Sequence, residues 1–295
     1  LILAIDRHIA DGAADLRAGR WNKGAYSQAS GLHGRTLGLL GFGGIGSALA
    51  RRAQAMGMDV IVWSRSLTPV AAAERGVRYA GSPEAVARHA DVLSVHLPLT
   101  PATRGLVGQS VFGAMRHGAM FINTARAEVV DDDALLVAMN RQAIRAGLDV
   151  FRGEPSIKEG VFVDPLAQHR SVVGSHHIGA STQQAQDAVA NEVVRIIKAY
   201  RESGKADNCV NLAQHTGADH CVVVRHLDRV GVLAAVLRTL RDANINVEEM
   251  ENTVFQGGEA AAARLQVKGR PGEDTVATMR AHAHVLHVSV VPLEV

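Results

Sequence analysis

Short apolar runs alternate with amphipathic segments over the first part of the chain. The runs lie at 37–40, 58–63, 92–97, 119–123, 144–150 and 171–174. They show no clean alternation of apolar and polar positions, which is typical of parallel strands covered on both faces. The helix-like segments between them lie at 45–56, 71–74, 83–89, 110–115 and 131–141. This rhythm predicts an α/β domain with a doubly wound parallel sheet of about six or seven strands.

The segments on either side of this pattern have a different character. Leu1, Ile2, Ile5, Ile9 and Leu16 recur on one face and predict a single amphipathic helix over 1–18. A surface connection is expected at 19–35, a long helix at 181–202, and a polar linker from Gly204 to about residue 218. The later pattern predicts strand, helix, two strands, helix and strand at 220–225, 231–242, 246–255, 260–267, 273–281 and 284–291. This order is that of a ferredoxin-like α+β module.

Composition excludes several classes of protein. The chain has 31 Lys and Arg against 29 Asp and Glu, so no net field favours nucleic acid or an anionic membrane surface as a partner. The apolar start ends at Asp6, well short of the ~20 residues that a membrane span needs. Two cysteines are too few for a disulfide framework and indicate a cytoplasmic protein. His282, His284 and His287 have no Cys or carboxylate at ligand spacing, so no metal site is predicted.

Three glycines with the spacing G-x-G-x-x-G follow the first apolar run, and a helical pattern begins at once. Strand, tight turn and helix form the context in which this spacing indicates a Rossmann-type dinucleotide site. Gly41 permits the turn, Gly43 lets a pyrophosphate approach the backbone, and Gly46 lets the helix pack against the strand. Together with Gly44 and Ile45, they place the free N–H groups of a helix N-terminus beside the phosphates.

The end of the second strand bears on which dinucleotide binds. In NAD enzymes an acidic residue about 20 positions beyond the turn normally holds the ribose hydroxyls. Here the segment reads Trp63-Ser64-Arg65-Ser66, without a carboxylate. Ser64 and Arg65 are candidates to accommodate the 2′-phosphate of NADP. The alternative is that Arg65 is a solvated loop residue and that NAD binds without the acid, so we expect NAD or NADP.

Three further stretches place polar residues at the C-terminal ends of predicted strands. Ligands bind at this edge of an open α/β sheet. The stretches cover 121–135, 147–155 and 175–182. Between them they offer an arginine, two carboxylates and a histidine for a site at that edge.

These stretches resemble the motifs of the D-isomer-specific 2-hydroxyacid dehydrogenases. Residues 123–131 match the family's Asn-Thr-Ala-Arg signature, except that Ala127 stands where glycine is usual. Residues 149–155 match a second motif, and 176–182 match a third with His176 in place of proline. With the glycine turn, four motifs match in order, which makes the resemblance specific.

The resemblance implies a role for each of four side chains. Arg126 binds the substrate carboxylate and carbonyl, His177 is the acid/base, Glu154 is its partner, and Asp149 lies on the nicotinamide side. The chemistry agrees, because imidazole has a pKa near working pH and a carboxylate on its far nitrogen stabilises the imidazolium. A planar guanidinium also holds a carboxylate in bidentate fashion. A lone Arg, Glu or His at a strand end is more often structural, so the assignment depends on the motifs together.

The C-terminal module resembles an ACT domain, a small regulatory fold that binds amino acids at dimer interfaces. The likeness lies in residues 224–233 and 244–247. It implies that His226, Gly231 and Asn246 lie where an L-serine effector binds, with Asp228 in place of the usual asparagine. The alternative is a purely structural module for oligomerisation. Homodimers or homotetramers are expected, since the dehydrogenase family pairs through its cofactor domain and ACT modules pair edge to edge.

The two resemblances together imply a dehydrogenase of a small-molecule substrate, which oxidises 3-phosphoglycerate to 3-phosphohydroxypyruvate in L-serine biosynthesis. The alternative is reduction of glyoxylate or hydroxypyruvate by the same core, or another D-2-hydroxyacid dehydrogenase activity. A catalytically silent nucleotide sensor or corepressor-like protein is a third reading, against which the intact Arg126, Glu154 and His177 argue.

The resemblances also divide the chain into parts. We expect a remnant of the substrate domain with a crossing helix at 1–30, the dinucleotide-binding domain at 31–180, a return helix and linker at 181–217, and the ACT domain at 218–295. Family members carry a longer segment ahead of the position of Leu1, which forms most of the substrate domain. We therefore expect this chain alone to bind dinucleotide but to turn over slowly.

Overall fold

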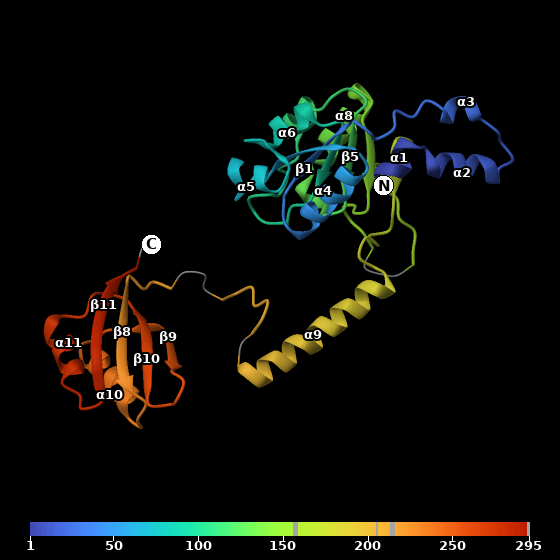
Figure 1. Ribbon diagram of the computed structural model, residues 1–295. Helices are drawn as coiled ribbons and strands as arrows, with labels where there is room; N and C mark the ends of the chain where they lie inside the picture. The colour runs from blue at the N-terminus through green and yellow to red at the C-terminus, as the bar shows by residue number, and fades with distance from the viewer. Residues whose placement is uncertain (156–158, 205, 213–215, 294–295) are drawn as a thin grey trace. The chain divides into compact units, whose positions relative to one another are not determined.

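The computed structural model describes residues 1–155, 159–204, 206–212 and 216–293 (Figure 1). The chain divides into two compact units, Leu1–Val194 and Arg195–Val295. Residue 205 and residues 213–215 of the expected linker lie outside the described residues. In the described part, none of the helices combines the length and the apolar composition needed to cross a bilayer.

Unit 1 is built on a seven-stranded parallel sheet with the order β3-β2-β1-β4-β5-β6-β7. The strands are β1 (Thr36–Leu40), β2 (Asp59–Trp63), β3 (Arg78–Tyr79), β4 (Val92–Val95), β5 (Met120–Asn123), β6 (Arg145–Leu148) and β7 (Val172–Gly174). The order reverses between β1 and β4, which is the point where an open α/β sheet forms its ligand crevice. The prediction of a doubly wound sheet is confirmed.

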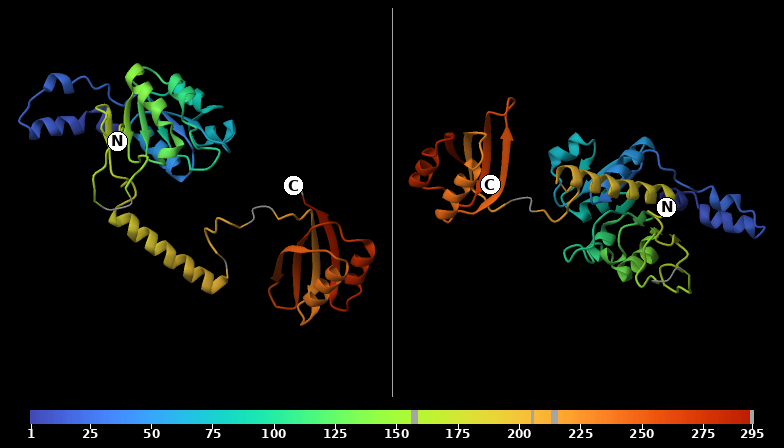
Figure 2. Two further views of the ribbon diagram at one scale, coloured as in Figure 1. Left: turned by 180° about the vertical axis from the view of Figure 1, so that it is seen from behind. Right: turned by 90° about the horizontal axis from the view of Figure 1, so that it is seen from below.

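Helices cover both faces of this sheet (Figures 1 and 2). They are α4 (Gly44–Ala55), α5 (Pro69–Glu74), α6 (Pro83–His89), α7 (Gln109–Ala114) and α8 (Asp132–Gln142), with a short 3₁₀ turn η1 at Ala127–Val129. One core cluster joins the sheet to α6, α7 and α8, and a second joins it to α4 and α5. The strand side chains alternate between the two clusters, so Leu37 and Leu39 face one and Leu40 faces the other.

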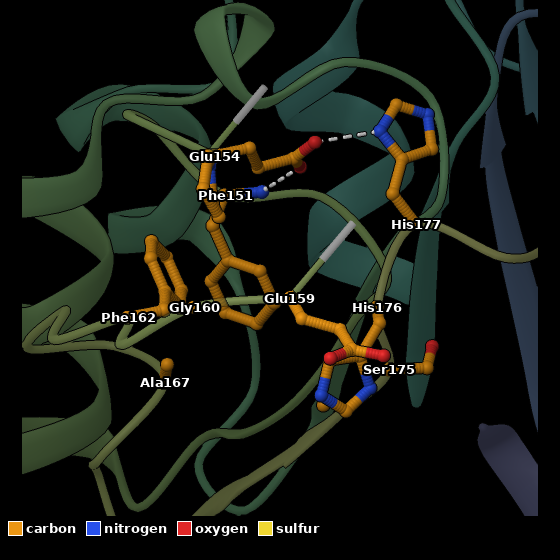
Figure 3. Close-up of a pocket in the computed structure, with 11 residues that line it drawn as sticks. Phe151, Glu154, Glu159, Gly160, Phe162, Ala167, Ser175, His176 and His177 are labelled. Atoms are coloured by element: carbon orange, nitrogen blue, oxygen red, sulfur yellow. Dashed lines mark hydrogen bonds and ion pairs between the residues drawn. The ribbon is translucent and has the colours of Figure 1, made fainter. Parts of the chain in front are cut away.

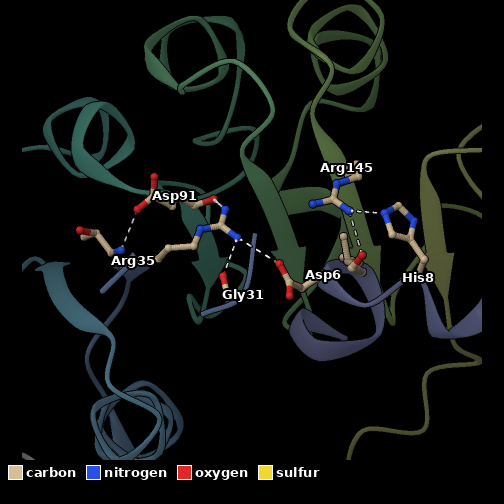
Figure 4. Close-up of polar contacts among 8 residues, drawn as sticks. Asp6, His8, Gly31, Arg35, Asp91 and Arg145 are labelled. Atoms are coloured by element: carbon tan, nitrogen blue, oxygen red, sulfur yellow. Dashed lines mark hydrogen bonds and ion pairs between the residues drawn. The ribbon is translucent and has the colours of Figure 1, made fainter. Parts of the chain in front are cut away.

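The prediction of one helix over 1–18 is wrong. The segment forms α1 (Ile2–Asp6) and α2 (Ile9–Arg17), and between them His8 has the left-handed φ of 51°. Arg145 Nη1 donates to the Ile5 carbonyl at 2.9 Å (Figure 4), and this is the acceptor that a continuous helix would offer to Ile9 N–H. Ile5 is therefore buried against the sheet, whereas Ile9 and Leu16 are exposed.

A polar network fixes α1 to the beginning of β1 (Figure 4). Arg35 Nη1 lies 3.3 Å from the buried Asp6 carboxylate and also donates to the Gly31 carbonyl. Arg35 Nη2 donates to the Asp91 carbonyl, and the Asp91 carboxylate accepts the Thr36 N–H at 2.8 Å. These contacts set where β1 begins and therefore where the glycine turn lies.

Two short elements were not expected from the sequence. Helix α3 (Lys23–Tyr26) lies inside the expected connection, and its N-cap Asn22 accepts the Ala25 N–H. Strand β3 has two residues, both exposed, so no apolar run marks it. The long helix expected at 181–202 is present as α9 (Gln183–Ser203).

Unit 2 has a four-stranded antiparallel sheet with the order β11-β8-β10-β9. Its elements follow one another as β8 (His220–Leu227), α10 (Val232–Asp242), β9 (Val247–Val254), β10 (Ala260–Val267), α11 (Glu273–Arg280) and β11 (Val285–Pro292). Both helices pack on the same face of the sheet, over a core that includes Val222, Leu240 and Leu265 (Figure 2). This βαββαβ order agrees with the one expected from the pattern.

Candidate functional site

The glycine turn lies between the end of β1 and the start of α4. Gly41 has a φ of 100°, and a Cβ at this residue would lie 2.4 Å from the His96 carbonyl oxygen. A Cβ on Gly46 would lie 2.4 Å from the Gly41 carbonyl oxygen. Both distances are far inside van der Waals contact, so only glycine lets strand, turn and helix approach this closely.

The outer side of the same turn is open at two of its glycines. A Cβ on Gly43 or Gly44 would meet no described atom within 4 Å. Gly43 is the N-cap of the twelve-residue α4, whose first turn contains no acidic residue. Ile45 is exposed at this helix end. The N–H groups of the first turn are without intrahelical partners, so the residues present fit a pyrophosphate group.

The end of β2 is adjacent to this turn, because Gly41 N–H donates to the Trp63 carbonyl at 2.8 Å. Ser64 is partly buried and Arg65 is exposed. The guanidinium of Arg65 has no hydrogen-bond or ion-pair partner among the described residues. Another cation, Arg75, lies 5.6 Å from the centre of the Phe42 ring. The cofactor edge of the sheet therefore carries positive charge where NAD enzymes normally have a carboxylate.

Arg126, Glu154 and His177 line one cavity of about 470 Å³. They come from the ends of three neighbouring strands: Arg126 follows β5, Glu154 follows β6 and His177 follows β7. The chain therefore brings a guanidinium, a carboxylate and an imidazole to one place. Arg126 is exposed, and its Nη1 donates to the Ala125 carbonyl at 2.6 Å. Its remaining N–H groups have no partner among the residues that the structure describes, so they are available to a ligand.

Glu154 and His177 form a hydrogen-bonded pair (Figure 3). The distance from His177 Nδ1 to Glu154 Oε2 is 2.7 Å. The other carboxylate oxygen, Oε1, accepts the Phe151 N–H at 2.7 Å. A carboxylate held in this way fixes the tautomer with a proton on Nδ1 and leaves Nε2 as the basic atom.

His176 and His177 point in opposite directions (Figure 3). His176 lines a second cavity of about 690 Å³ together with Glu159 and Phe162, and Glu154 and His177 also contribute to its lining. His177 itself has a φ of 54°, which is uncommon for a residue with a side chain.

Asp149 is buried at the end of β6. Its carboxylate accepts the Ser175 hydroxyl at 2.5 Å and the N–H groups of Ile178 at 3.1 Å and Gly179 at 2.9 Å. Burial opposes ionisation of this carboxyl, but the three hydrogen bonds outweigh it, and the pKa of Asp149 lies below its usual value. Asp149 is therefore an anion tied to the segment that carries His177.

Asn123 belongs to the site, although the sequence did not single it out. It is buried at the end of β5, where Oδ1 accepts the Ala125 N–H and Nδ2 donates to the Arg126 carbonyl, both at 3.0 Å. The side chain closes the turn that presents Arg126. An asparagine directly after an apolar run is the available signal, because its side chain commonly replaces backbone contacts in a turn.

Two further features lie beside the cavity. Ala127 stands where the family usually has glycine. It is buried in η1 and its φ is not positive, so the backbone there accommodates a residue with a Cβ. Arg152 Nε lies 3.0 Å from Asp132 Oδ2. Burial raises the pKa of Asp132 to about 6, although the Arg152 charge acts in the opposite direction.

In unit 2, the ring of His226 is buried and both of its nitrogens have partners. Nδ1 lies 2.8 Å from the Leu227 carbonyl oxygen, and Nε2 lies 3.1 Å from Asn252 Oδ1 on β9. Asn252 could not be identified from the sequence, because an asparagine inside a strand gives no signal of its own.

The other residues expected at an effector site have separate positions. Gly231 has a φ of 92° and is the N-cap of α10. Asp228 N–H donates to the Glu259 carbonyl at 3.0 Å. Asn246 Nδ2 donates to Glu248 Oε1 at 2.9 Å. Within the described residues, none of these three groups is hydrogen-bonded to the His226 ring, whose partners are Leu227 and Asn252.

Comparison with known proteins identifies the family of the first unit. The family profile of the D-isomer specific 2-hydroxyacid dehydrogenase, NAD binding domain, matches residues 1–179. The chain is also similar to the crystal structure of D-lactate dehydrogenase with NAD+ from Lactobacillus jensenii. That similarity has a TM-score of 0.63 and 27% sequence identity, and it covers 72% of this chain and 66% of that one.

Curated relatives carry two kinds of name. The chain is 37% identical over 218 residues to a glyoxylate reductase of Thermococcus litoralis, which is 72% of this chain and 64% of the relative. It is 33% identical over 271 residues to a D-3-phosphoglycerate dehydrogenase of Mycobacterium bovis, which is 90% of this chain and 48% of the relative. The chain thus spans from about half to about two thirds of the length of these relatives. Unit 1 is an NAD(P)-binding domain, and the chain belongs to the D-isomer-specific 2-hydroxyacid dehydrogenase family.

Proposed function

We propose that the protein is a D-3-phosphoglycerate dehydrogenase, which oxidises 3-phosphoglycerate to 3-phosphohydroxypyruvate with NAD or NADP. The observation that carries the proposal is the Glu154–His177 hydrogen bond of 2.7 Å in a cavity that Arg126 also lines. An acid/base and a carboxylate-binding cation beside a dinucleotide turn are the groups that oxidation of a 2-hydroxy acid requires.

In the proposed mechanism, His177 is the base. Glu154 accepts the Nδ1–H, so Nε2 is free to take the proton of the substrate's 2-hydroxyl group. The imidazolium that forms is stabilised by the ionised Glu154. Arg126 binds the substrate carboxylate with its unpaired N–H groups and thereby orients C2. The chemistry that NAD or NADP supplies when bound is acceptance of the hydride from C2.

The extent of the similarity favours phosphoglycerate over glyoxylate as the substrate. The match to the phosphoglycerate dehydrogenase covers 271 residues, which is far more than the 194 residues of unit 1. It therefore includes part of unit 2.

The two cysteines, Cys209 and Cys221, are both free in the described structure, which supports a cytoplasmic location for this biosynthetic step.

A direct substrate comparison tests the proposal. Purified protein is assayed for oxidation of 3-phosphoglycerate and for reduction of 3-phosphohydroxypyruvate, hydroxypyruvate and glyoxylate by following the reduced nicotinamide. We expect kcat/KM for 3-phosphohydroxypyruvate to exceed that for glyoxylate by at least about tenfold. A preference of that size for glyoxylate would assign the chain to the reductases. Dinucleotide binding without turnover of any of the four would favour the nucleotide-sensing alternative.

We propose that unit 2 is an ACT module that joins subunits into a homodimer or homotetramer and binds L-serine. Its βαββαβ order and the left-handed Gly231 at the start of α10 support this assignment. Titration calorimetry with L-serine, with D-serine as the control, tests effector binding. Light scattering of the protein as it elutes from a size-exclusion column tests whether subunits associate into dimers or tetramers. Oligomers that bind no L-serine would identify a structural module.

A further inference from the structure

The segments that carry Arg126 and Glu154 separate beyond the ends of their strands. The last backbone hydrogen bond between them is donated by Asp149, one residue past the end of β6. After it, residues 124–132 lead through η1 into α8, and residues 150–155 form a loop whose last four residues are exposed. No backbone hydrogen bond joins these two segments in the described part of the chain. Their spacing therefore depends on side chains.

The segment that carries Arg126 is anchored in the core. The Val129 carbonyl accepts the Val107 N–H, and the Asp131 N–H donates to the Val107 carbonyl, both at 3.0 Å. The side chains of Val129 in η1 and Leu135 in α8 are fully buried. This segment is therefore a fixed support for the more exposed loop beside it.

Arg152 joins the exposed loop to the anchored segment. Its Nη2 donates to the Val130 carbonyl, and its Nε lies 3.0 Å from Asp132 Oδ2 at the start of α8. A guanidinium can hold two acceptors at once because its N–H groups are fixed in one plane. The Phe151 N–H, next to Arg152, donates to Glu154 Oε1 at 2.7 Å and closes the turn. The contacts of Arg152 therefore hold the turn that presents Glu154.

We infer that Arg152 is a positioning residue that holds Glu154 in place relative to Arg126. The inference rests on the proposed function, in which Glu154 stabilises the protonated His177. A direct contact with the substrate is the competing role, because Arg152 lines the same cavity of about 470 Å³ and its Nη1 has no partner among the described residues. The other two nitrogens of the guanidinium already contact the protein, which favours the positioning role.

Arg152→Met tests the inference, because methionine keeps part of the length of the side chain and removes every donor. Hydrogen exchange of the Phe151 amide is the first measurement. We expect this amide to exchange at least about tenfold faster in the variant, since the turn that it closes loses its anchor. This readout does not depend on turnover, so it tests the anchoring even if the proposed function fails.

Steady-state kinetics with 3-phosphoglycerate provide the second measurement. A displaced Glu154 predicts a fall in kcat of at least about tenfold, while the dinucleotide Kd changes by less than about twofold, because the glycine turn is untouched. The Tm falls by no more than about 4 °C, since a half-exposed ion pair contributes little to stability. A large loss of kcat with a small loss of stability is not expected of a purely structural residue.

Two variants of the same contacts refine the test. Arg152→Lys keeps a cation that reaches Asp132 or the Val130 carbonyl, but it does not hold both in a fixed geometry. We therefore expect its kcat to lie between those of the parent protein and Arg152→Met. Asp132→Ala removes one of the two acceptors. Added to Arg152→Met, it causes no further loss of kcat, because the two residues act as one unit.

Arg116→Met is the matched control. Arg116 Nη1 lies 2.9 Å from Asp91 Oδ1, and its Nε donates to the Arg88 carbonyl, so this guanidinium also holds a carboxylate and a backbone oxygen. The exposed fractions of the two side chains of this ion pair are 49% and 24%, against 48% and 25% for Arg152 and Asp132. We expect Arg116→Met to leave kcat unchanged.

Two outcomes would overturn the inference. One is that either kcat or the exchange of the Phe151 amide is the same in Arg152→Met as in the parent protein. The other is a KM for 3-phosphoglycerate raised by about tenfold or more at unchanged kcat, which would assign Arg152 to the substrate. If the parent protein oxidises no 2-hydroxy acid, the proposed function fails, and amide exchange alone decides whether Arg152 anchors the loop. Arg152→Lys takes the place of a methionine variant that does not fold.

Discussion

Two alanine substitutions in the glycine turn separate the folding of the turn from its binding of dinucleotide. Gly46→Ala places a methyl carbon 2.4 Å from the Gly41 carbonyl oxygen, which is backbone and has no rotamer to change. The contact is about 1 Å shorter than ordinary packing permits, so α4 has to shift away from β1. Overpacking of this kind costs about 1–3 kcal/mol. Gly43→Ala adds the same methyl group where no described atom lies within 4 Å.

The expected results follow from this difference. At about 2–4 °C per kcal/mol for a domain of this size, Gly46→Ala lowers the Tm of the cofactor-free protein by about 2–12 °C. Gly43→Ala lowers it by no more than about 4 °C, because the residue is an N-cap with a φ of −77° that alanine also adopts. Its methyl group occupies the space assigned to the pyrophosphate, so we expect the dinucleotide Kd to rise at least about tenfold.

Thermal unfolding without cofactor and a fluorescence titration with NADH and NADPH measure the two quantities. The reasoning fails if Gly43→Ala binds dinucleotide like the parent protein, because the pyrophosphate would then not lie at this turn. It also fails if Gly46→Ala is as stable as the parent.

Three further predictions concern the chemistry of the site, the choice of cofactor and the response to pH. Glu154→Gln lowers kcat on the order of 10²-fold or more, with unchanged dinucleotide affinity, because the imidazolium loses its charged partner; an unaltered kcat contradicts the proposed role. The protein shows no strong preference for NAD over NADP, and Arg65→Ser weakens NADPH binding selectively; a thousandfold preference of kcat/KM for NAD contradicts this. The pKa of Asp132 is about 6 in the folded state, against 3.8 in the unfolded chain. The folded state therefore binds more protons than the unfolded chain between these two pH values. As a result, the free energy of unfolding falls as the pH rises from about 4 to about 6. Asp132→Asn removes this fall, which amounts to at most about 3 kcal/mol. Burial lowers the pKa of His96 to about 4, and this makes the free energy of unfolding of the parent protein rise with pH over the same range. Denaturant titrations of parent and variant at pH 4 to 7 are therefore compared. The same pH dependence of the free energy of unfolding in both proteins would be evidence against the prediction.

The parallel sheet was predictable because its five inner strands, from β2 to β6 in the sheet order, are largely buried on both faces. A strand that is buried on both faces, such as β4, requires a continuous run of apolar residues. Such a run can be recognised directly in the sequence. The prediction of one helix over 1–18 was wrong because the end of α1 depends on a contact with a distant part of the chain. The contact that ends α1 comes from Arg145, which lies 140 residues away from Ile5, and no local periodicity can indicate it.

The candidate site divides in the same way. The sequence predicts that Arg126, Glu154 and His177 lie at one edge of the sheet, because each follows a strand and the C-terminal ends of parallel strands lie together. Their catalytic roles stay predictions. The contacts of Asp149 with Ile178 and Gly179 join residues about thirty positions apart, and the tie between His226 and Asn252 crosses a sheet. Tertiary packing alone creates such contacts.

These long-range contacts link the site into one unit. The Asn123 side chain bonds to the Arg126 carbonyl, and the Asn123 carbonyl accepts the Asp149 N–H. The Asp149 carboxylate then holds the backbone on both sides of His177. A series of hydrogen bonds therefore connects the turn after β5, which carries Arg126, with the segment after β7, which carries His177. The series passes through Asp149 at the end of β6. The spacing of the three groups thus depends on the register of three strands rather than on the conformation of any one loop, and rigid strands hold such spacing better than loops do.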